Sequence, residues 1–175
     1  MDNKYSSTAQ LDSGRSDSDF KSGFVAVVGR PNVGKSTLLN TILGQKVSIV
    51  THKAQTTRTR VYGIKSSGDS QIVFIDTPGF CSDRTPLHKA MRKLAGSQAN
   101  DSDISVVVVE ARESKPSLTE LDRAALQAAT GKDRTVIVAL NKVDKIKQKD
   151  LLLPWIQFLD GLDGVQAVIP ISAMS

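Results

Sequence analysis

The sequence predicts an α/β fold, a three-layer sandwich whose sheet is mostly parallel with one antiparallel edge strand. Short apolar runs, several of them continuous and β-branched, alternate with segments of helical spacing. This alternation is typical of parallel strands that are buried on both faces between helices. The turn sequence SSGDS at 66–70 joins two neighbouring strands directly, which predicts a single hairpin in the otherwise parallel sheet.

Six strands and four helices are expected in order along the chain. The expected strands are the runs at 24–29, 60–64, 71–76, 104–110, 134–141 and 165–172, and the expected helices are 35–44, 86–99, 117–131 and 149–162. Gly44 and Gly131 stand where helix C-caps belong. Trp155, Phe158 and Leu159 recur at helical spacing, so we expect them to face the core. Ligands of such a fold bind at the carboxyl ends of the strands.

Length and composition indicate one folded domain behind a polar tail. The chain has 175 residues, of which 39% are hydrophobic and 23% are charged. Residues 1–22 are rich in Ser and Asp without a hydrophobic period, which predicts a disordered tail and leaves 23–175 as the domain. The sequence ends directly after the last expected strand, where such sheets carry a closing helix. We therefore expect a truncated domain with one face partly uncovered.

Charge and cysteine content narrow the class of protein and its compartment. The net charge of +5 favours polyanionic partners such as nucleotides, RNA or acidic membrane surfaces. A single cysteine, Cys81, excludes an internal disulfide and fits a reducing compartment. The sequence contains no run of roughly 18 apolar residues and no secretory signal, so a cytoplasmic location is expected. His52, His88 and Cys81 belong to no catalytic motif and are expected to be bystanders.

The run GRPNVGKST at 29–37 fits the spacing G-x-x-x-x-G-K-[ST] between an expected strand and an expected helix. Its glycines let the backbone curl so that N–H groups face phosphate oxygens, and the helix N-terminus adds its dipole. Lys35 is expected to reach the β- and γ-phosphates, and Ser36 to bind Mg²⁺. The sandwich is therefore expected to be of the P-loop NTPase type. Its expected nucleotide-binding residues in this run are Gly29, Arg30, Pro31, Asn32, Val33, Gly34, Lys35, Ser36 and Thr37.

Two further polar segments are expected to sense the γ-phosphate. Asp76 begins DTPG at a strand end, where its carboxylate can hold Mg²⁺ while the Gly79 N–H approaches the γ-phosphate. DTPG could also be a plain turn, but its place after an apolar strand favours the metal role. In the basic loop THKAQTTRTR, Thr56 and Thr57 both offer the hydroxyl that a nucleotide switch needs. Spacing alone does not choose between them, and Thr57 is our working assignment.

The motif NKVD at 141–144 predicts guanine as the base. Asp144 can accept from both N1–H and the 2-amino group of guanine, whereas adenine would leave it unpaired, a discrimination of about 10⁴-fold or more. Asn141 is expected to reach the other edge of the purine and to tie this loop to the phosphate loop. The aliphatic stem of Lys142 is expected to lie over the base. Ser172 and Ala173 can present a backbone N–H to the guanine O6.

Together, GRPNVGKS, TT, DTPG, NKVD and SA resemble the translation-factor-related GTPases, and among them the Era family. The segment STLLNTILGQKVSIVTHKAQTTRTRVYGI resembles the phosphate helix and first switch of that family, with KAQTTR in place of the GTTRD of the EngA and MnmE relatives. LLLPWIQFL also resembles Era. The resemblance covers about residues 23–175. It implies a GTPase in maturation of the small ribosomal subunit, cytoplasmic with some peripheral association with the inner membrane, and we expect a monomer.

The resemblance also implies partners and a catalytic cation. Era proteins carry a C-terminal KH domain that binds 16S rRNA, and this chain does not include it, so the 30S subunit and 16S rRNA are partners implied by the family. An apolar residue at the position of Phe80 is usual there, although it cannot orient a water. In relatives with an asparagine at the position of Asn32, K⁺ acts where an arginine finger otherwise would. The expected catalytic residues are Asn32, Lys35 and Thr57, and the expected Mg²⁺ ligands are Ser36, Thr57 and Asp76.

Three alternatives stay open. The chain could be a guanine-nucleotide-binding switch fragment without useful turnover. It could be a sibling GTPase of the EngA or MnmE type, against which KAQTTR argues. An ATP-using kinase or ATPase is a third alternative, and NKVD argues against it.

Overall fold

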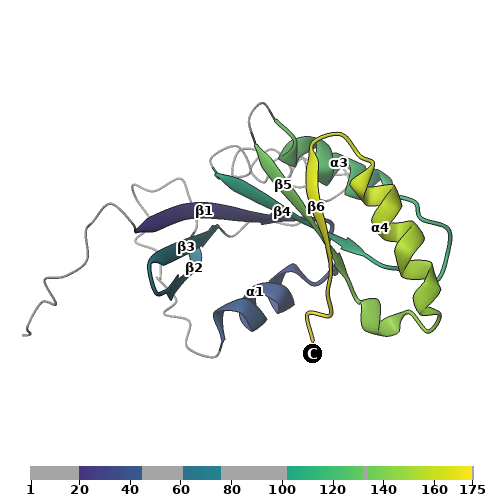
Figure 1. The fold of residues 1–175 in the computed structure, drawn as a ribbon, viewed down its shortest axis with the longest axis horizontal. Helices are drawn as coiled ribbons and strands as arrows, with labels where there is room; N and C mark the ends of the chain where they lie inside the picture. The colour runs from purple at the N-terminus through teal and green to yellow at the C-terminus, as the bar shows by residue number, and fades with distance from the viewer. Residues whose placement is uncertain (1–19, 45–60, 76–101, 132–133, 175) are drawn as a thin grey trace, which may run out of the picture.

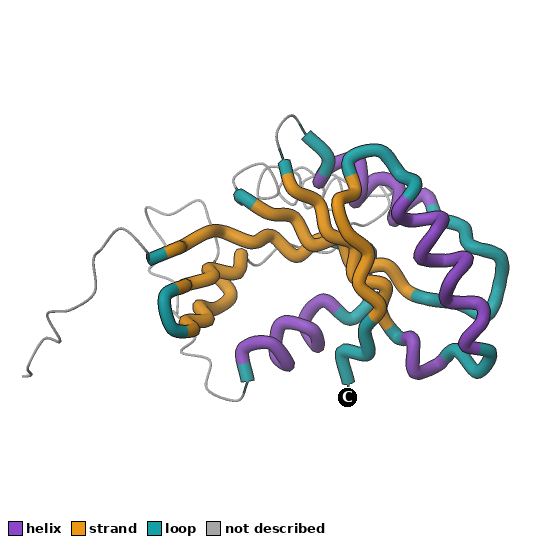
Figure 2. Tube along the Cα trace, viewed as in Figure 1, coloured by secondary structure: helices purple, strands orange, loops and turns teal. Residues whose placement is uncertain are grey.

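The computed structural model describes residues 20–44, 61–75, 102–131 and 134–174, which form one sheet flanked by helices (Figures 1 and 2). The expected helix at 86–99 lies outside these residues. The strands are β1 Lys21–Val28, β2 Val61–Ser67, β3 Ser70–Ile75, β4 Ile104–Glu110, β5 Thr135–Asn141 and β6 Val165–Pro170. The helices are α1 Lys35–Leu43, α3 Glu120–Ala129 and α4 Leu152–Asp160, with 3₁₀ turns η2 Val143–Lys145 and η3 Lys149–Leu151.

The sheet has the strand order β2-β3-β1-β4-β5-β6. Only β2, at one edge, is antiparallel to its neighbour; the pairs β3–β1, β1–β4, β4–β5 and β5–β6 are parallel. The turn between β2 and β3 contains Gly68 at φ 53, a left-handed conformation that glycine adopts without strain. The predicted fold class, a mostly parallel sheet with one antiparallel edge strand, is confirmed.

β1 begins at Lys21, three residues before the expected strand and two residues inside the expected tail. The added residues, Lys21 to Gly23, pair in parallel with Ser70 to Ile72 of β3. Because strand pairing uses backbone N–H and C=O groups, these polar and small residues join the ladder without an apolar signal in the sequence.

Two apolar clusters fill the space on the two faces of the sheet. Alternate residues of β1 face opposite sides: Ala26 and Val28 contact the cluster of α3 and α4, whereas Val25 and Val27 contact the cluster of α1. The larger cluster contains the fully buried Trp155 of α4. The helices thus form layers on either side of the sheet, and the loops that leave β1, β4, β5 and β6 meet at its carboxyl edge (Figure 1).

The three residues expected to face the core from the fourth helix do so. Trp155 and Leu159 have no exposed surface, and Phe158, partly buried, meets the Trp155 ring edge-on at a centroid distance of 6.4 Å. Gly44 is the C-cap of α1 as predicted, with φ 70. α3 ends at Ala129, so its C-cap is Thr130, one residue before the expected cap Gly131.

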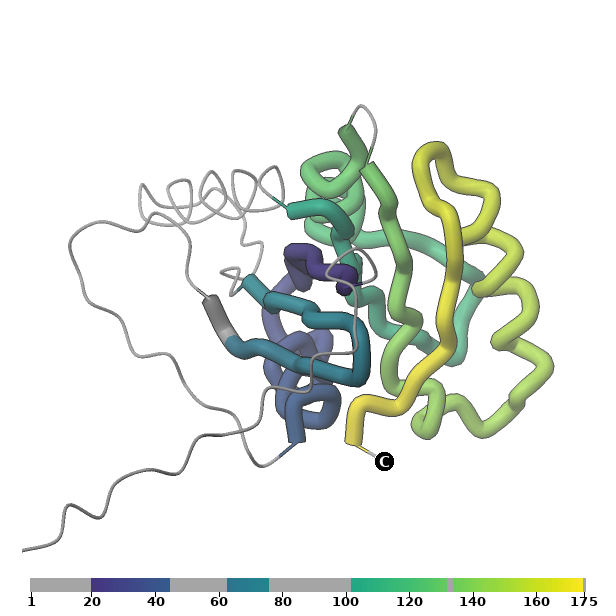
Figure 3. The backbone as a smooth tube through the Cα atoms, turned by 60° about the vertical axis from the view of Figure 1, so that its left-hand side comes forward, coloured from purple at the N-terminus to yellow at the C-terminus, as the bar shows by residue number. Residues whose placement is uncertain are grey.

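The α1 side of the sheet is less fully covered at β6. Ile169 pairs with Ala139 and shares its face, yet 49% of Ile169 is exposed. The segment after β6 then turns towards α1 (Figure 3), where the Thr41 hydroxyl donates to the Ala173 carbonyl at 2.8 Å.

Among the described residues there is no helix long and apolar enough to cross a membrane.

Candidate nucleotide-binding site

The loop between β1 and α1 depends on two glycines. Gly29 has φ 152, and a Cβ there would lie 2.7 Å from the Val108 carbonyl oxygen. Gly34 has φ 105, and a Cβ there would lie 2.2 Å from Nδ2 of Asn141. Val33, between them, is fully buried and anchors the loop in the core. The predicted curl of the phosphate loop is therefore present, and its glycines are required by backbone angle and by close approach.

The ammonium group of Lys35 lies against the phosphate loop. Its Nζ donates to the carbonyl oxygens of Gly29 at 3.0 Å and Arg30 at 2.9 Å. Gly34 is the N-cap of α1 and supplies no side-chain cap, and the first turn of α1 holds no acidic residue. The positive end of the α1 dipole therefore points at the phosphate loop, and no acidic side chain of the first turn offsets it.

Asn141 joins the phosphate loop to the loop after β6. The side chain is buried, its Nδ2 donates to the Val33 carbonyl at 2.7 Å, and its Oδ1 accepts from the Ala173 N–H at 3.0 Å. Thr41 binds the carbonyl of the same Ala173. The tie that the sequence predicted for Asn141 is present, and the Ala173 N–H, one of the two donors expected for guanine O6, is engaged by Asn141.

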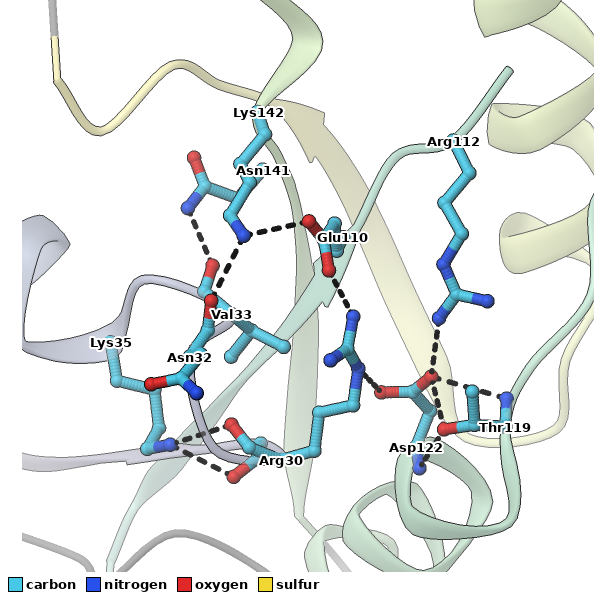
Figure 4. Close-up of polar contacts among 11 residues, drawn as sticks. Arg30, Asn32, Val33, Lys35, Glu110, Arg112, Thr119, Asp122, Asn141 and Lys142 are labelled. Carbon is cyan, nitrogen blue, oxygen red and sulfur yellow. Dashed lines mark hydrogen bonds and ion pairs between the residues drawn. The ribbon is translucent and has the colours of Figure 1, made fainter. Parts of the chain in front are cut away.

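Lys142 reaches across to the phosphate loop from the other side. Its φ of 65 turns the chain after β5, and its Nζ donates to the Asn32 carbonyl at 2.9 Å and to Oε1 of Glu110 at 2.7 Å. Asp144 follows in η2 and is exposed. The predicted base loop therefore lies beside the phosphate loop, with an exposed carboxylate and a lysine stem that spans the two (Figure 4).

Glu110 is a site residue that the motif search missed. It is the last residue of β4, and its two oxygens pair with different cations: Oε1 with Lys142 and Oε2 with Arg30. Partial burial raises the pKa of the Glu110 carboxyl, but the hydrogen bonds and charges of Lys142 and Arg30 outweigh it, so the pKa lies below its ordinary value of 4.5. The signal available in the sequence was its position at a strand end.

Asp122 is a second missed residue and holds Arg30 from the opposite side (Figure 4). Its side chain has no exposed surface, and its Oδ1 lies 3.4 Å from Nε of Arg30. Its Oδ2 accepts from the N–H and hydroxyl of Thr119 in a capping box at the start of α3, and lies 3.6 Å from Nη2 of Arg112. The spacing T-x-x-D at 119–122 was the available signal.

Several expected site residues lie outside the described residues. Within the described part, Gly29 to Thr37, Asn141, Lys142, Asp144, Ser172 and Ala173 are brought to one edge of the sheet. Thr56, Thr57, Asp76, Gly79 and Phe80, with His52, Cys81 and His88, are not described.

The described residues supply one expected Mg²⁺ ligand, the exposed hydroxyl of Ser36 in the first turn of α1. The described part of the chain has no group of three or more His, Cys, Asp or Glu side chains that could hold a metal ion.

Comparison with known protein families shows the family to which the chain belongs. The family described as 50S ribosome-binding GTPase matches residues 24–142, from β1 through the phosphate loop to the start of NKVD. The chain belongs to this GTPase family. The predicted family resemblance is confirmed, since the chain is also similar to GTPases named Era.

The curated relatives that match include several GTPases named Era. The Era of Syntrophus aciditrophicus is 44% identical over 156 residues, covering 89% of this chain and 50% of that protein. The Era of Glaesserella parasuis is 45% identical over 152 residues, covering 86% of this chain and 49% of that protein. The chain therefore spans about half the length of the curated relatives it matches.

Solved structures of Era proteins match the fold. Era in complex with MgGDPNP and a segment of 16S ribosomal RNA has a TM-score of 0.72 and 38% identity, covering 89% of this chain and 52% of that chain. An Era variant from Aquifex aeolicus bound to GDP and AlF₄⁻ has a TM-score of 0.71 with the same identity and coverage. This GTPase domain thus has the P-loop fold that the sequence predicted.

Proposed function

We propose that this GTPase domain binds GTP and hydrolyses it to GDP and phosphate by in-line attack of water. The observation that supports it most is the pair of hydrogen bonds made by the Asn141 side chain, which donates to the Val33 carbonyl in the phosphate loop and accepts from the Ala173 N–H in the loop after β6. One buried side chain thereby fixes how far the phosphate-binding segment lies from the base-binding segment. A nucleotide carries phosphates at one end and a base at the other, so such a pair of segments is suited to bind one.

The phosphate side of the proposal rests on Lys35 and Ser36. Lys35 now binds two loop carbonyls, and we propose that it exchanges them for the β- and γ-phosphate oxygens. Ser36, with Thr57 and Asp76, would hold Mg²⁺, whose chemistry is to neutralise charge on those oxygens. Lys35→Ala and Ser36→Ala should each abolish productive nucleotide binding, measured by calorimetric titration with GDP and GTP. Unchanged affinity in both variants would contradict this assignment.

The base side rests on Asp144. Its exposed carboxylate would accept from guanine N1–H and the 2-amino group, while Lys142 covers the base plane. Asp144→Asn should shift preference from guanine to xanthine nucleotides, because the amide can donate where the carboxylate accepts. Retained guanine selectivity in this variant would exclude the contact. Competition by ATP against labelled GTP would favour an ATP-using enzyme instead.

We propose that K⁺ takes part in hydrolysis beside Asn32. Asn32 is exposed at φ 63 in the phosphate loop, and its carbonyl is held by Lys142, so its side chain is available to a cation. Because Phe80 cannot orient a water, this cation would stabilise the developing charge, and intrinsic turnover would be slow. Phosphate release should be faster in K⁺ than in Na⁺, and Asn32→Ala should remove the difference. Equal rates in the two salts would end the proposal.

We further propose a role in maturation of the small ribosomal subunit, in the cytoplasm with peripheral contact to the inner membrane. The support is the Era-type domain and the solved Era complex with 16S ribosomal RNA. The test is cosedimentation of a chain extended to the full length of its relatives with 30S subunits, with and without a GTP analogue. A switch fragment without useful turnover, or a sibling GTPase, would bind nucleotide but fail the release assay or the 30S assay respectively.

A further inference from the structure

Glu110 occupies a central place between the two loops of the site. It is the last residue of β4, which pairs with β1 on one side and with β5 on the other. β1 leads into the phosphate loop, and β5 leads into the base loop, with Glu110 paired in register with Asn141. A side chain at this strand end can therefore contact both loops.

The carboxylate of Glu110 uses one oxygen for each loop. Oε1 accepts from Lys142 Nζ at 2.7 Å, and Oε2 pairs with the Arg30 guanidinium. All three side chains are 20–23% exposed, so these pairs are partly removed from water. Hydrogen bonds between ionised partners in such surroundings are roughly twice as strong as neutral ones.

Each cation that Glu110 holds also reaches the phosphate loop. Lys142 Nζ donates both to the Asn32 carbonyl and to Glu110 Oε1. Because Glu110 binds the ammonium group, it keeps the lysine side chain directed along the phosphate loop. The backbone carbonyl of Arg30 accepts from Lys35, whose ammonium is expected to meet the phosphates. Arg30 is fixed from its far side by the buried Asp122, which leaves the guanidinium clamped between two carboxylates (Figure 4).

We propose that Glu110 is a positioning residue that ties the base loop to the phosphate loop. Through Lys142 it holds the stem over the base, and through Arg30 it holds the peptide that meets Lys35. This inference rests on the proposed nucleotide binding and assigns a role to a residue outside the five GTPase motifs named above. Loss of the carboxylate should lower the affinity for guanine nucleotides even where the fold is intact, because Lys142 would no longer be held in place.

The test compares Glu110→Gln with Glu120→Gln, which removes the same charge from an exposed position at the start of α3. GDP affinity is measured by calorimetry, and GDP release is followed with radiolabelled nucleotide, at a temperature where circular dichroism shows every variant folded. Glu110→Gln should raise the Kd for GDP about tenfold, mostly through faster release, because it removes the negative charge that Lys142 and Arg30 both pair with. Glu120→Gln should stay within twofold of the unmodified chain.

A double-mutant cycle tests whether Glu110 affects GDP affinity through Lys142. The change Lys142→Met keeps the stem and removes the charge, so Glu110→Gln should add little to it. Fully additive losses would overturn the link between Glu110 and the base loop. Glu110→Asp keeps the charge but shortens its reach, and should give an intermediate loss; it also serves if Glu110→Gln does not fold. An affinity for Glu110→Asp as weak as that of Lys142→Met would overturn the role of the charge.

The outcomes separate this inference from the proposed function. An unmodified chain that binds no guanine nucleotide overturns both. An unmodified chain that binds GDP, with Glu110→Gln inside twofold of it, overturns only the positioning role. Equal losses in Glu110→Gln and Glu120→Gln would assign the effect to net charge and would also overturn that role.

Discussion

The phosphate loop and the base loop leave neighbouring parts of one sheet edge, but they are stabilised in different ways. The phosphate loop depends on backbone conformation, with positive φ at Gly29, Asn32 and Gly34. The base loop depends on side chains, because Asn141 and Lys142 bind carbonyls of the phosphate loop. In the proposed nucleotide complex, the phosphates would meet backbone N–H groups together with Lys35 and Ser36, whereas the base would meet side chains of the base loop.

Because of this difference, the two loops should be sensitive to different kinds of substitution. The phosphate loop leaves no room for a Cβ at Gly34, so it should be damaged by adding one carbon. The base loop should instead be damaged by removing polar groups, because Asn141 satisfies buried backbone groups that nothing else would satisfy.

Gly34→Ala should abolish measurable GDP binding and lower the free energy of unfolding by more than about 2 kcal/mol. The new Cβ would stand 2.2 Å from Asn141 Nδ2 at a φ of 105, so both the turn and its partner are disturbed. Denaturant unfolding and GDP calorimetry measure the two losses. Gly44→Ala is the control: its φ is 70 and nothing lies within 4 Å, so about 1 kcal/mol of stability and no GDP affinity should be lost.

Asn141→Ala should cost about 2–4 kcal/mol of unfolding free energy, because it removes two hydrogen bonds and leaves the Val33 carbonyl and the Ala173 N–H buried without their partner. GDP affinity should fall with it. The matched control is Gln157→Ala, which truncates an exposed amide on α4. If the two variants unfold at the same denaturant concentration, the side-chain account of the base loop is wrong.

Thr41→Val should lower the free energy of unfolding by about 1 kcal/mol, the usual net value of one hydrogen bond. The hydroxyl of Thr41 donates to the Ala173 carbonyl and fixes the loop after β6 against α1. Because that loop is expected to contact guanine, GDP affinity should fall by a small factor while affinity for pyrophosphate stays constant. Thr41→Ser keeps the hydroxyl and should restore GDP affinity; failure to do so would contradict the assignment.

The smallest effect expected is a pH dependence from Glu110. Its folded pKa lies below the ordinary value, so the folded state favours the carboxylate. The stability it contributes is fully present above about pH 4.5 and is lost as the pH falls through the lower folded pKa. Thermal melting between pH 5 and pH 3 should therefore decline less steeply in Glu110→Gln than in the unmodified chain. Parallel declines would show that Glu110 gains nothing from its two cations.

The sheet and the two nucleotide loops could be predicted from the sequence because their signals are local. Continuous β-branched runs predicted the buried strands, and G-x-x-x-x-G-K-[ST] with NKVD predicted which strand ends carry the site. The start of β1 could not be predicted, since Lys21 and Ser22 pair through backbone groups and carry no apolar pattern.

The carboxylates that hold Arg30 could not be predicted from the same signals. Arg30 and Glu110 are 80 positions apart, and only the sheet order places β4 beside β1. Asp122 carried a local capping signal, but that signal predicts a helix start rather than a contact with the phosphate loop. Long-range ion pairs of this kind follow from topology, which short motifs do not encode.

The indole of Trp155 has a practical consequence. It is the only tryptophan of the chain, it is fully buried in α4, and its Nε1 donates to the Arg112 carbonyl at 3.0 Å. Arg112 contacts Asp122, which in turn contacts Arg30 of the phosphate loop. Tryptophan emission therefore comes from one buried indole, which two ion pairs connect to Arg30 of the phosphate loop. We therefore expect nucleotide exchange to change tryptophan emission, a signal that needs no added label.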